Sequence, residues 1–215
     1  MTAISFTITL GLLAAFAYLP SAPRPPTAWR SVLKTVPLAA FALAAWLAGA
    51  SPFLTAALAM SALGDLALSR EGRPAFLYGL SSFGLAHLFY VLAFTAASDM
   101  ALSEAFFQQP LAACALLALA LSTELWLAPH TGGLAWPVRG YVLLIAVMGL
   151  AALVLPPGLA AARIGAVLFI ASDLILALRL FRLHEGHGAE APAAWAVWVL
   201  YIGGQVLILM AFAAP

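Results

Sequence analysis

The stretch AAARIGAVLFIASDLILALRL at residues 160–180 decides the fold class. It is almost wholly apolar and carries charge only at Arg163, Asp173 and Arg179. About 20 predominantly apolar residues suffice for a helix to cross the hydrocarbon core of a bilayer, because each residue advances the helix by about 1.5 Å. The stretch therefore predicts a transmembrane helix, and Asp173 is an acidic side chain at membrane depth.

The rest of the chain has a similar composition. Of its 215 residues, 65% are hydrophobic and only 8% are charged, whereas soluble domains carry about 25% charged residues. A chain with so few charges cannot cover its surface in water, so its solvent must be lipid. The net charge is only +1, and the sequence contains no basic cluster that would indicate a nucleic-acid partner. The single cysteine, Cys114, excludes an internal disulfide.

Apolar runs separated by turn signals predict one all-α domain over residues 1–215, an integral membrane bundle of eight transmembrane helices. Proline, glycine and charged residues gather between the runs, as in Pro20–Pro26 and Pro156–Gly158. The first run lacks a basic segment before it and a small-residue cleavage site, so we expect it to be retained rather than removed as a signal peptide. The predicted spans are residues 4–20, 31–49, 52–69, 75–97, 109–128, 138–155, 160–180 and 193–213.

The basic residues predict how the chain lies in the membrane. Lys and Arg concentrate in the short loops on the cytoplasmic side. With the N- and C-termini outside, eight of the nine basic residues fall at inner joints, and only Arg163 lies outside. Asp99 and Glu104 then share an outer loop. We therefore expect both termini outside, and the composition, rich in Ala, Leu and Arg, suggests the cytoplasmic membrane of a bacterium.

Several polar side chains fall inside the predicted spans, where a charge is costly and should face the bundle interior or a water-filled cavity. Asp65 lies five residues before Arg70, and Asp173 lies six residues before Arg179. Both carboxyl groups are therefore predicted at nearly the same depth, in the cytoplasmic half. The other polar residues predicted near this layer are Lys34, His87, Tyr90, Glu124, Tyr141, Tyr201 and Gln205.

The surroundings of the two aspartates resemble each other. The segment ALGDLAL at residues 62–68 is similar to ASDLILA at residues 171–177, and an arginine follows each. The two copies lie four spans apart and so keep the same orientation, as in a parallel repeat. A pseudo-twofold axis normal to the membrane would bring the aspartates together. The alternative is a chance similarity in a chain rich in alanine and leucine.

The positions that bear a family pattern are Gly64-Asp65-Leu66-Ala67-Leu68, then Phe76, Gly79, Phe83, His87 and Tyr90, then Ser172-Asp173-Leu174, with weaker agreement at Lys34 and Pro37, at Tyr141 and Met148, and at Tyr201 and Gln205. In this order the sequence resembles the YhhN family of multi-pass membrane proteins, which includes the lysoplasmalogenases. The resemblance runs from the second predicted span to the last. Glu124 has no place in the family pattern.

The resemblance implies hydrolysis of the vinyl ether bond of lysoplasmalogens, which gives a fatty aldehyde and a glycerophospho-ethanolamine or -choline. Such a bond breaks through slow protonation at carbon and capture of the resulting oxocarbenium ion by water. Two carboxyl groups in one low-dielectric site suit this chemistry when one keeps its proton and the other is ionised. We expect Asp65 and Asp173 to form this pair, and His87 and Tyr90 to orient the pair or the water.

Substrate binding is predicted for a second group of polar residues. Lys34, near the inner mouth, and Arg139 are expected to hold the phosphate of the lysophospholipid. No metal or nucleotide motif is present, so we expect no cofactor. The pair His184 and His187 is interpreted as part of a solvated loop rather than as a metal site. The remaining candidates for substrate binding are Glu124, Tyr141, Tyr201 and Gln205.

Two other classes of function stay open. Buried acidic and histidine side chains also serve transporters and proton pathways, but a pathway needs polar groups through to the outer face. The outer halves of the predicted spans carry almost no polar side chains, which favours a pocket open only toward the cytoplasm. The third class is a lipid-binding membrane protein in which the acidic pair is only structural.

Overall fold

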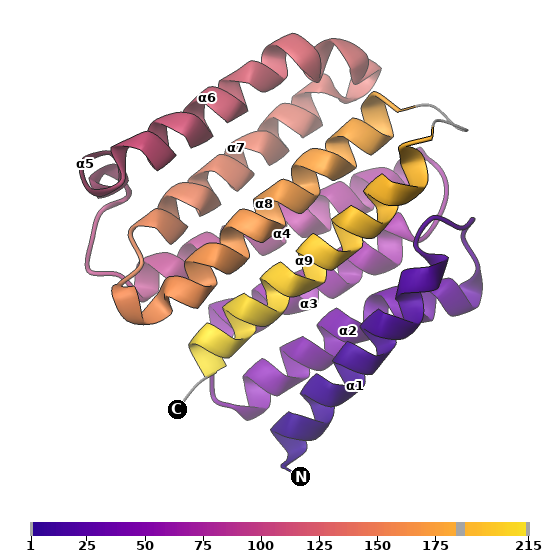
Figure 1. Ribbon diagram of the computed structural model, residues 1–215, viewed down its shortest axis with the longest axis horizontal. Coiled ribbons are helices and arrows are strands. Elements are labelled where there is room, and N and C mark those ends of the chain that lie inside the picture. The colour runs from indigo at the N-terminus through magenta and orange to yellow at the C-terminus, as the bar shows by residue number, and fades with distance from the viewer. Residues whose placement is uncertain (1, 184–187, 214–215) are drawn as a thin grey trace.

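The computed structural model describes residues 2–183 and 188–213, which form a bundle of helices with no strand among them (Figure 1). The predicted all-α class is confirmed. A short helix, α5 (Ala105–Gln108), lies in the loop before α6. The long helices are α1 (Ala3–Tyr18), α2 (Ala28–Leu47), α3 (Pro52–Leu68), α4 (Arg73–Ala96), α6 (Pro110–Trp126), α7 (Ala135–Leu153), α8 (Ala160–Phe181) and α9 (Glu190–Ala213).

Most of these helices are long and apolar enough to cross a membrane. Within the described residues, seven helices meet this condition, and α3 is a shorter apolar helix of 17 residues. Each of the eight predicted spans falls on one long helix, with its ends displaced by a few residues. The protein is therefore a multi-pass membrane protein. Eight crossings, with α3 at the lower limit of span length, remain a proposal.

Tight joints hold the first helices as antiparallel neighbours. The helix α3 begins at Pro52, and the side chain of Ser51 accepts a hydrogen bond from the Phe53 amide. This arrangement suits proline, which has no amide hydrogen to lose in the first turn of a helix. Gly49, before α3, and Gly72, before α4, have φ angles of 69° and 98°. Because glycine alone adopts such angles without strain, these positions allow the chain to reverse within a few residues.

The helices have corresponding neighbours in the two halves of the chain. In the first half, α1 packs on α2, α2 on α3, and α3 on α4. In the second half, α6 packs on α7, α7 on α8, and α8 on α9. The halves meet where α4 packs on α7 and where α9 packs on α2 (Figure 1). The parallel repeat predicted from the two aspartate segments requires this pattern of neighbours.

Small residues let particular helices approach closely. A Cβ atom added at Gly204 of α9 would lie 2.7 Å from the carbonyl oxygen of Gly165 on α8, and one added at Gly165 would lie 2.6 Å from that of Gly204. Between α3 and α4, a Cβ atom at Gly64 of α3 would meet the ring of Phe83 on α4 at 2.5 Å. These contacts set the positions of α3, α4, α8 and α9, the helices that carry most of the buried polar groups.

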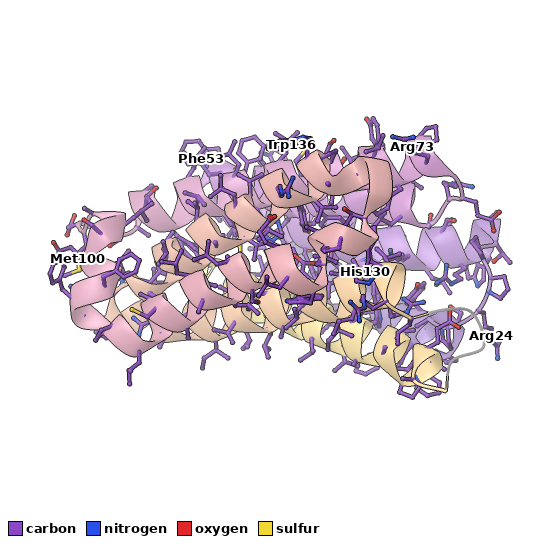
Figure 2. All side chains as sticks on the ribbon, turned by 90° about the horizontal axis from the view of Figure 1, so that it is seen from above. Arg24, Phe53, Arg73, Met100, His130 and Trp136 are labelled. Atoms are coloured by element: carbon purple, nitrogen blue, oxygen red, sulfur yellow. The ribbon has the colours of Figure 1, made fainter. Side chains whose placement is uncertain are left out.

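One end of the bundle is rich in arginine. Figure 2 shows Arg24 and Arg73 toward one end and Met100 at the other. At the basic end, Arg30 fixes the segment between α1 and α2. Its Nε donates to the Ser21 carbonyl oxygen and its Nη2 to that of Ala22, both at 2.9 Å, while its guanidinium lies over the ring of Tyr18. This segment is therefore held against the bundle.

Candidate active site

Asp65 forms a first polar cluster with residues from two other helices. The Tyr201 hydroxyl, on α9, donates to Asp65 Oδ2 at 2.8 Å, and Lys34 Nζ, on α2, lies 3.4 Å from Oδ1. Asp65 itself is only 1% exposed. A buried carboxylate needs an opposite charge and hydrogen-bond donors to offset the loss of water. Lys34 supplies the opposite charge and Tyr201 supplies a hydrogen-bond donor, so both needs of a buried Asp65 carboxylate are met.

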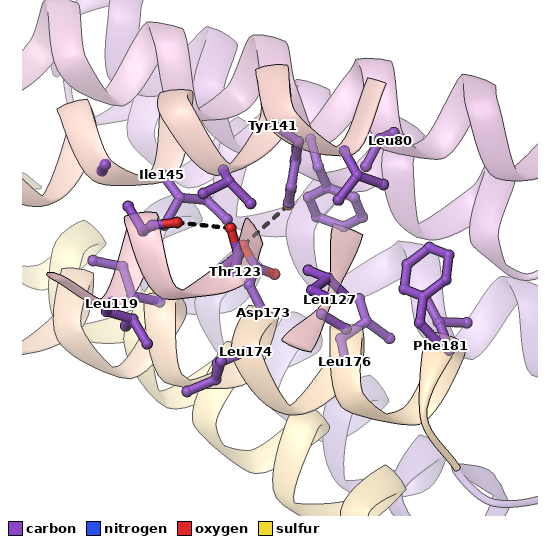
Figure 3. Close-up of a pocket in the computed structure, with 18 of the residues that line it drawn as sticks. Leu80, Leu119, Thr123, Leu127, Tyr141, Ile145, Asp173, Leu174, Leu176 and Phe181 are labelled. Atoms are coloured by element: carbon purple, nitrogen blue, oxygen red, sulfur yellow. Dashed lines mark hydrogen bonds between the residues drawn. The ribbon is translucent and has the colours of Figure 1, made fainter. Parts of the chain in front are cut away.

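Asp173 forms a second cluster in the same manner. The Tyr141 hydroxyl, on α7, donates to Asp173 Oδ2 at 3.0 Å (Figure 3). His87 Nε2, on α4, lies 3.2 Å from the same oxygen, at ion-pair distance but without the alignment of a hydrogen bond. His87 is fully buried, and Asp173 is 7% exposed. The partner of this carboxyl group is therefore a residue that can hold or release a proton.

The other ring nitrogen of His87 fixes where its first hydrogen lies. His87 Nδ1 lies 2.7 Å from the Phe83 carbonyl oxygen, one turn earlier in α4. A carbonyl oxygen only accepts, so Nδ1 carries a hydrogen, an assignment made from this partner. The other ring nitrogen, Nε2, then faces the Asp173 carboxyl group at 3.2 Å, and Asp173 lines a cavity. Imidazole and carboxyl groups are the side chains that most often serve in acid–base catalysis.

The two clusters have corresponding origins in the two halves of the chain. Each aspartate lies on the third long helix of its half, α3 or α8, and each has a partner on the second, Lys34 or Tyr141. The last partner comes from the fourth long helix of the other half, Tyr201 or His87. The ring of Phe169 contacts both of these, with centroid distances of 5.4 Å and 4.6 Å. The clusters are thus adjacent around one aromatic ring.

Both aspartates line one polar cavity of about 580 Å³. Ligand pockets commonly measure about 300–1,000 Å³, so the volume suits a small molecule or a lipid headgroup. No hydrogen bond or ion pair between the two carboxyl groups occurs in the described part of the chain, since each has its own partners. The cavity opens at the basic end, where its lining includes Arg24, Arg30, Glu71, Arg179 and Glu190.

Asp173 also borders an apolar groove. The groove lies between α4, α6, α7 and α8, and Tyr141 and Thr123 line it close to the aspartate (Figure 3). Thr123 does not compete for the carboxylate, because its hydroxyl donates to the Ala120 carbonyl oxygen within α6. Asp173 is therefore the point at which a polar space and an apolar space meet.

Tyr90 and Gln205 form a buried pair that is separate from the two clusters. The Tyr90 hydroxyl donates to Gln205 Oε1, and both side chains are fully buried. Neither residue lines the polar cavity, and in the described part of the chain neither forms a hydrogen bond or ion pair with an aspartate. The structure places this pair between α4 and α9, where it joins the two helices that carry His87 and Tyr201.

The prediction that Glu124 faces the bundle interior was wrong. Glu124 lies on the exposed side of α6, and its carboxylate pairs with Arg139 of α7 at 2.7–3.1 Å. Neither residue lines the polar cavity. Near the end of a helix, a charged side chain can reach the membrane surface, and a bidentate arginine provides strong pairing there. Spacing along the sequence predicts the depth of Glu124 but does not reveal this partner.

In the sequence Arg179 indicates only the topology, but in the structure it lines the polar cavity. Its Nη2 lies 3.8 Å from Glu190 Oε1, and its Nε is buried with no hydrogen-bond partner among residues 2–183 and 188–213. Its place on the same helix as Asp173, close to the inner end, is the signal that could have identified it. The pair His184 and His187 lies outside the described residues.

Comparison with known proteins identifies the family of the chain. The model of the YhhN family matches residues 29–212, which include every residue of the two clusters. The chain belongs to the YhhN family. This YhhN-family chain is 33% identical over 178 residues to proteins named lysoplasmalogenase in Mycobacterium bovis and Mycobacterium tuberculosis. The match covers 81% of this chain and 66% of each relative, just under two thirds of their length. No solved structure matches the chain.

Proposed function

We propose that this protein hydrolyses the vinyl ether bond of lysoplasmalogens, with a fatty aldehyde and a glycerophospho-ethanolamine or -choline as products. The observation that carries the proposal is the pair of buried aspartates on one polar cavity, one beside a lysine and the other beside a histidine. The relatives named lysoplasmalogenase support the same substrate class.

The partners of the aspartates suggest a division of roles. Lys34 offers a positive charge to Asp65, which favours an ionised carboxylate. Asp173 faces a histidine whose Nδ1 is already committed to the Phe83 carbonyl oxygen, which leaves a place for one shared proton. We therefore assign Asp173, together with His87, as the proton donor, and Asp65 as the anion that stabilises the cation and positions water.

The proposed reaction then balances in three steps. The proton from the Asp173 and His87 pair bonds to the vinyl carbon remote from the ether oxygen, using the electron pair of the double bond, and an oxocarbenium ion forms. Water adds to the cationic carbon and gives up a proton to a carboxylate of the site, which leaves a hemiacetal. The bond to the glycerol oxygen breaks, this oxygen takes a proton, and the hemiacetal hydroxyl becomes the aldehyde.

The headgroup is assigned to the basic mouth of the cavity. The sequence predicted Lys34 and Arg139 as phosphate ligands, but Lys34 is paired with Asp65 and Arg139 with Glu124. Arg24 and Arg179 line the mouth. The contact of Arg179 with Glu190, at 3.8 Å, is longer than those of Lys34 and Arg139 with their partners, and guanidinium groups suit phosphate oxygens. We therefore assign the lipid phosphate to these arginines.

The orientation of the protein belongs to the same proposal. The arginine-rich end, at which the cavity opens, is assigned to the cytoplasmic side of a bacterial cell membrane because short basic loops are retained there. With eight crossings in one domain over residues 1–215, both termini lie outside.

The test is an assay of aldehyde release from lysoplasmenylethanolamine by the purified protein. We expect Asp65→Asn and Asp173→Asn each to lower the rate by about 10²–10⁴-fold, the usual contribution of a general acid or base. Glu124→Gln, at an exposed carboxylate outside the cavity, is the matched control and should keep the wild-type rate. Thermal unfolding of each variant checks that it is folded.

Three outcomes would contradict the proposal. A folded Asp65→Asn or Asp173→Asn variant with full activity would remove that carboxyl group from the mechanism. Wild-type protein that releases no aldehyde from any vinyl-ether lysolipid would exclude the reaction. If a lysolipid then raised the unfolding temperature without turnover, the chain would be a lipid-binding protein.

A further inference from the structure

An apolar groove runs along most of the interface between α6, α7 and α8. Its inner part borders Asp173, Trp126 and Phe181, and is lined almost entirely by apolar side chains. A second hollow continues it toward Arg163, at the opposite end of α8. The two parts share Leu116, Leu119 and Ile170 as lining residues. Together they form one path, which we call the chain groove.

The chain groove meets the polar cavity at Asp173. The residues that line both spaces are four apolar side chains and this aspartate. A lysoplasmalogen has the same order of parts, because its vinyl ether joins a polar glycerophosphate to a long hydrocarbon chain. A headgroup at the basic mouth and a chain in the groove would therefore set the bond to be cleaved beside Asp173.

The chain groove is open to lipid because α6 lies at the edge of the bundle (Figure 1). Few residues of α6 are buried, namely Ala113 and Thr123, and its main neighbour among the long helices is α7. Large apolar side chains on its outer face, such as Leu121 and Leu125, are exposed. A hydrocarbon chain could thus enter sideways from the bilayer without passing through the polar mouth.

We propose that the chain groove binds the alkenyl chain of the lysolipid, with the first carbons of the chain beside Asp173 and the remainder extending toward Arg163. This assignment rests on the proposed function for its substrate. Asp173 lies ten positions after Arg163 in α8, which corresponds to about 15 Å along the helix. Residues deeper in the groove therefore determine which chain lengths fit.

The first experiment locates the chain without requiring catalysis. Purified protein in nanodiscs receives an alkyl-ether lysophosphatidylcholine, which has no vinyl bond, with a photoreactive diazirine at the end of its chain. We expect crosslinks on the outer halves of α6, α7 and α8, around Ala112, Gly149 and Val167. A diacyl phosphatidylcholine with the same diazirine is the control. Crosslinks on α1 and α2, or the same distribution for both lipids, would overturn the assignment.

The second experiment narrows the groove at two depths. Ala120 lines the part near Asp173, and Ala115 lines the outer part. Ala120→Phe should lower the rate for every chain length, whereas Ala115→Phe should lower it about tenfold or more only for long chains, the discrimination a few methylenes can give. Ala118→Phe is the matched control, because Ala118 is exposed on the same helix and lines neither part.

The two experiments separate this inference from the proposed function. Groove-specific crosslinks with no aldehyde from any vinyl-ether lysolipid would reject the reaction and keep the chain site. The opposite result is also informative. If the protein releases aldehyde but folded Ala115→Phe and Ala118→Phe variants both have the chain-length profile of the wild type, the reaction is kept and the chain site is rejected.

Discussion

Asp65 and Lys34 illustrate, at the scale of single residues, how a membrane bundle holds a charge. Their side chains come from α3 and α2 and lie 3.4 Å apart, with exposures of only 2% and 15%. Removing one partner of a buried ion pair leaves the other charge without compensation, which usually costs about 3–5 kcal/mol. Removing both charges together avoids most of that cost.

We therefore predict that Lys34→Met lowers the stability of the protein by a few kcal/mol, whereas the double variant Lys34→Met/Asp65→Asn recovers most of the loss. Thermal unfolding in detergent measures both. The single variant Asp65→Asn completes the double-mutant cycle. If the double variant is less stable than Lys34→Met alone, the two residues do not compensate each other's charge.

The sequence predicted the members of the two clusters better than their pairing. Helical rise placed Asp65 and Asp173 at one depth, and the cost of burying polar groups implied that Tyr141 and Tyr201 faced inward. Depth and face do not reveal which helices are neighbours, so the partner of each carboxyl group could not be predicted. The prediction that Glu124 faces inward was wrong for the same reason. Its arginine partner lies on a neighbouring helix and lets it remain on the outer side of α6.

At the scale of helices, the contact between α8 and α9 positions Phe169, the ring that lies between the two clusters. A Cβ atom at Gly204 would meet the Gly165 carbonyl oxygen at 2.7 Å and the backbone nitrogen of Phe169 at 3.1 Å. Backbone atoms cannot turn aside as the end of a flexible side chain can. An added methyl group must therefore push the two helices apart and displace Phe169, whose ring contacts His87 and Tyr201.

We predict that Gly204→Ala lowers the stability by about 1–3 kcal/mol, as overpacking of a close contact usually does, and also slows aldehyde release. The neighbouring variant Gly203→Ala is the control, since a Cβ atom there would meet only Leu168 at an ordinary 3.7 Å. Thermal unfolding and the aldehyde assay test the pair of variants. Equal behaviour of the two would show that the close approach of α8 and α9 is not required.

The long helices were predictable because the length of an apolar run and the turn-forming residues that bound it are local properties of the sequence. Ser51 and Pro52 marked the start of α3, and Pro157 marked the turn before α8. The short helix α5 was not predicted, because a single turn of helix in a polar loop has no periodic pattern to reveal it. The closeness of α8 and α9 also depends on both helices at once, so one segment alone could not predict it.

At the scale of the whole molecule, the proposed topology places the polar cavity toward the cytoplasm. Glu71 lies exposed at the mouth of this cavity, and Asp99 is exposed in the loop after α4. In a Cys114→Ala background, Glu71→Cys should react with a membrane-impermeant thiol reagent only in inverted vesicles, whereas Asp99→Cys should react in intact cells. Labelling of Glu71→Cys in intact cells would reverse the orientation.

The exchange of partners between the two halves of the chain makes each cluster depend on both halves. Asp65 depends on Tyr201 from the second half, and Asp173 depends on His87 from the first. A polypeptide with only four of the long helices could not complete either cluster, and two copies would have to associate to build both. Because one chain holds both halves, corresponding positions are free to carry different residues, and here one cluster contains a lysine and the other a histidine.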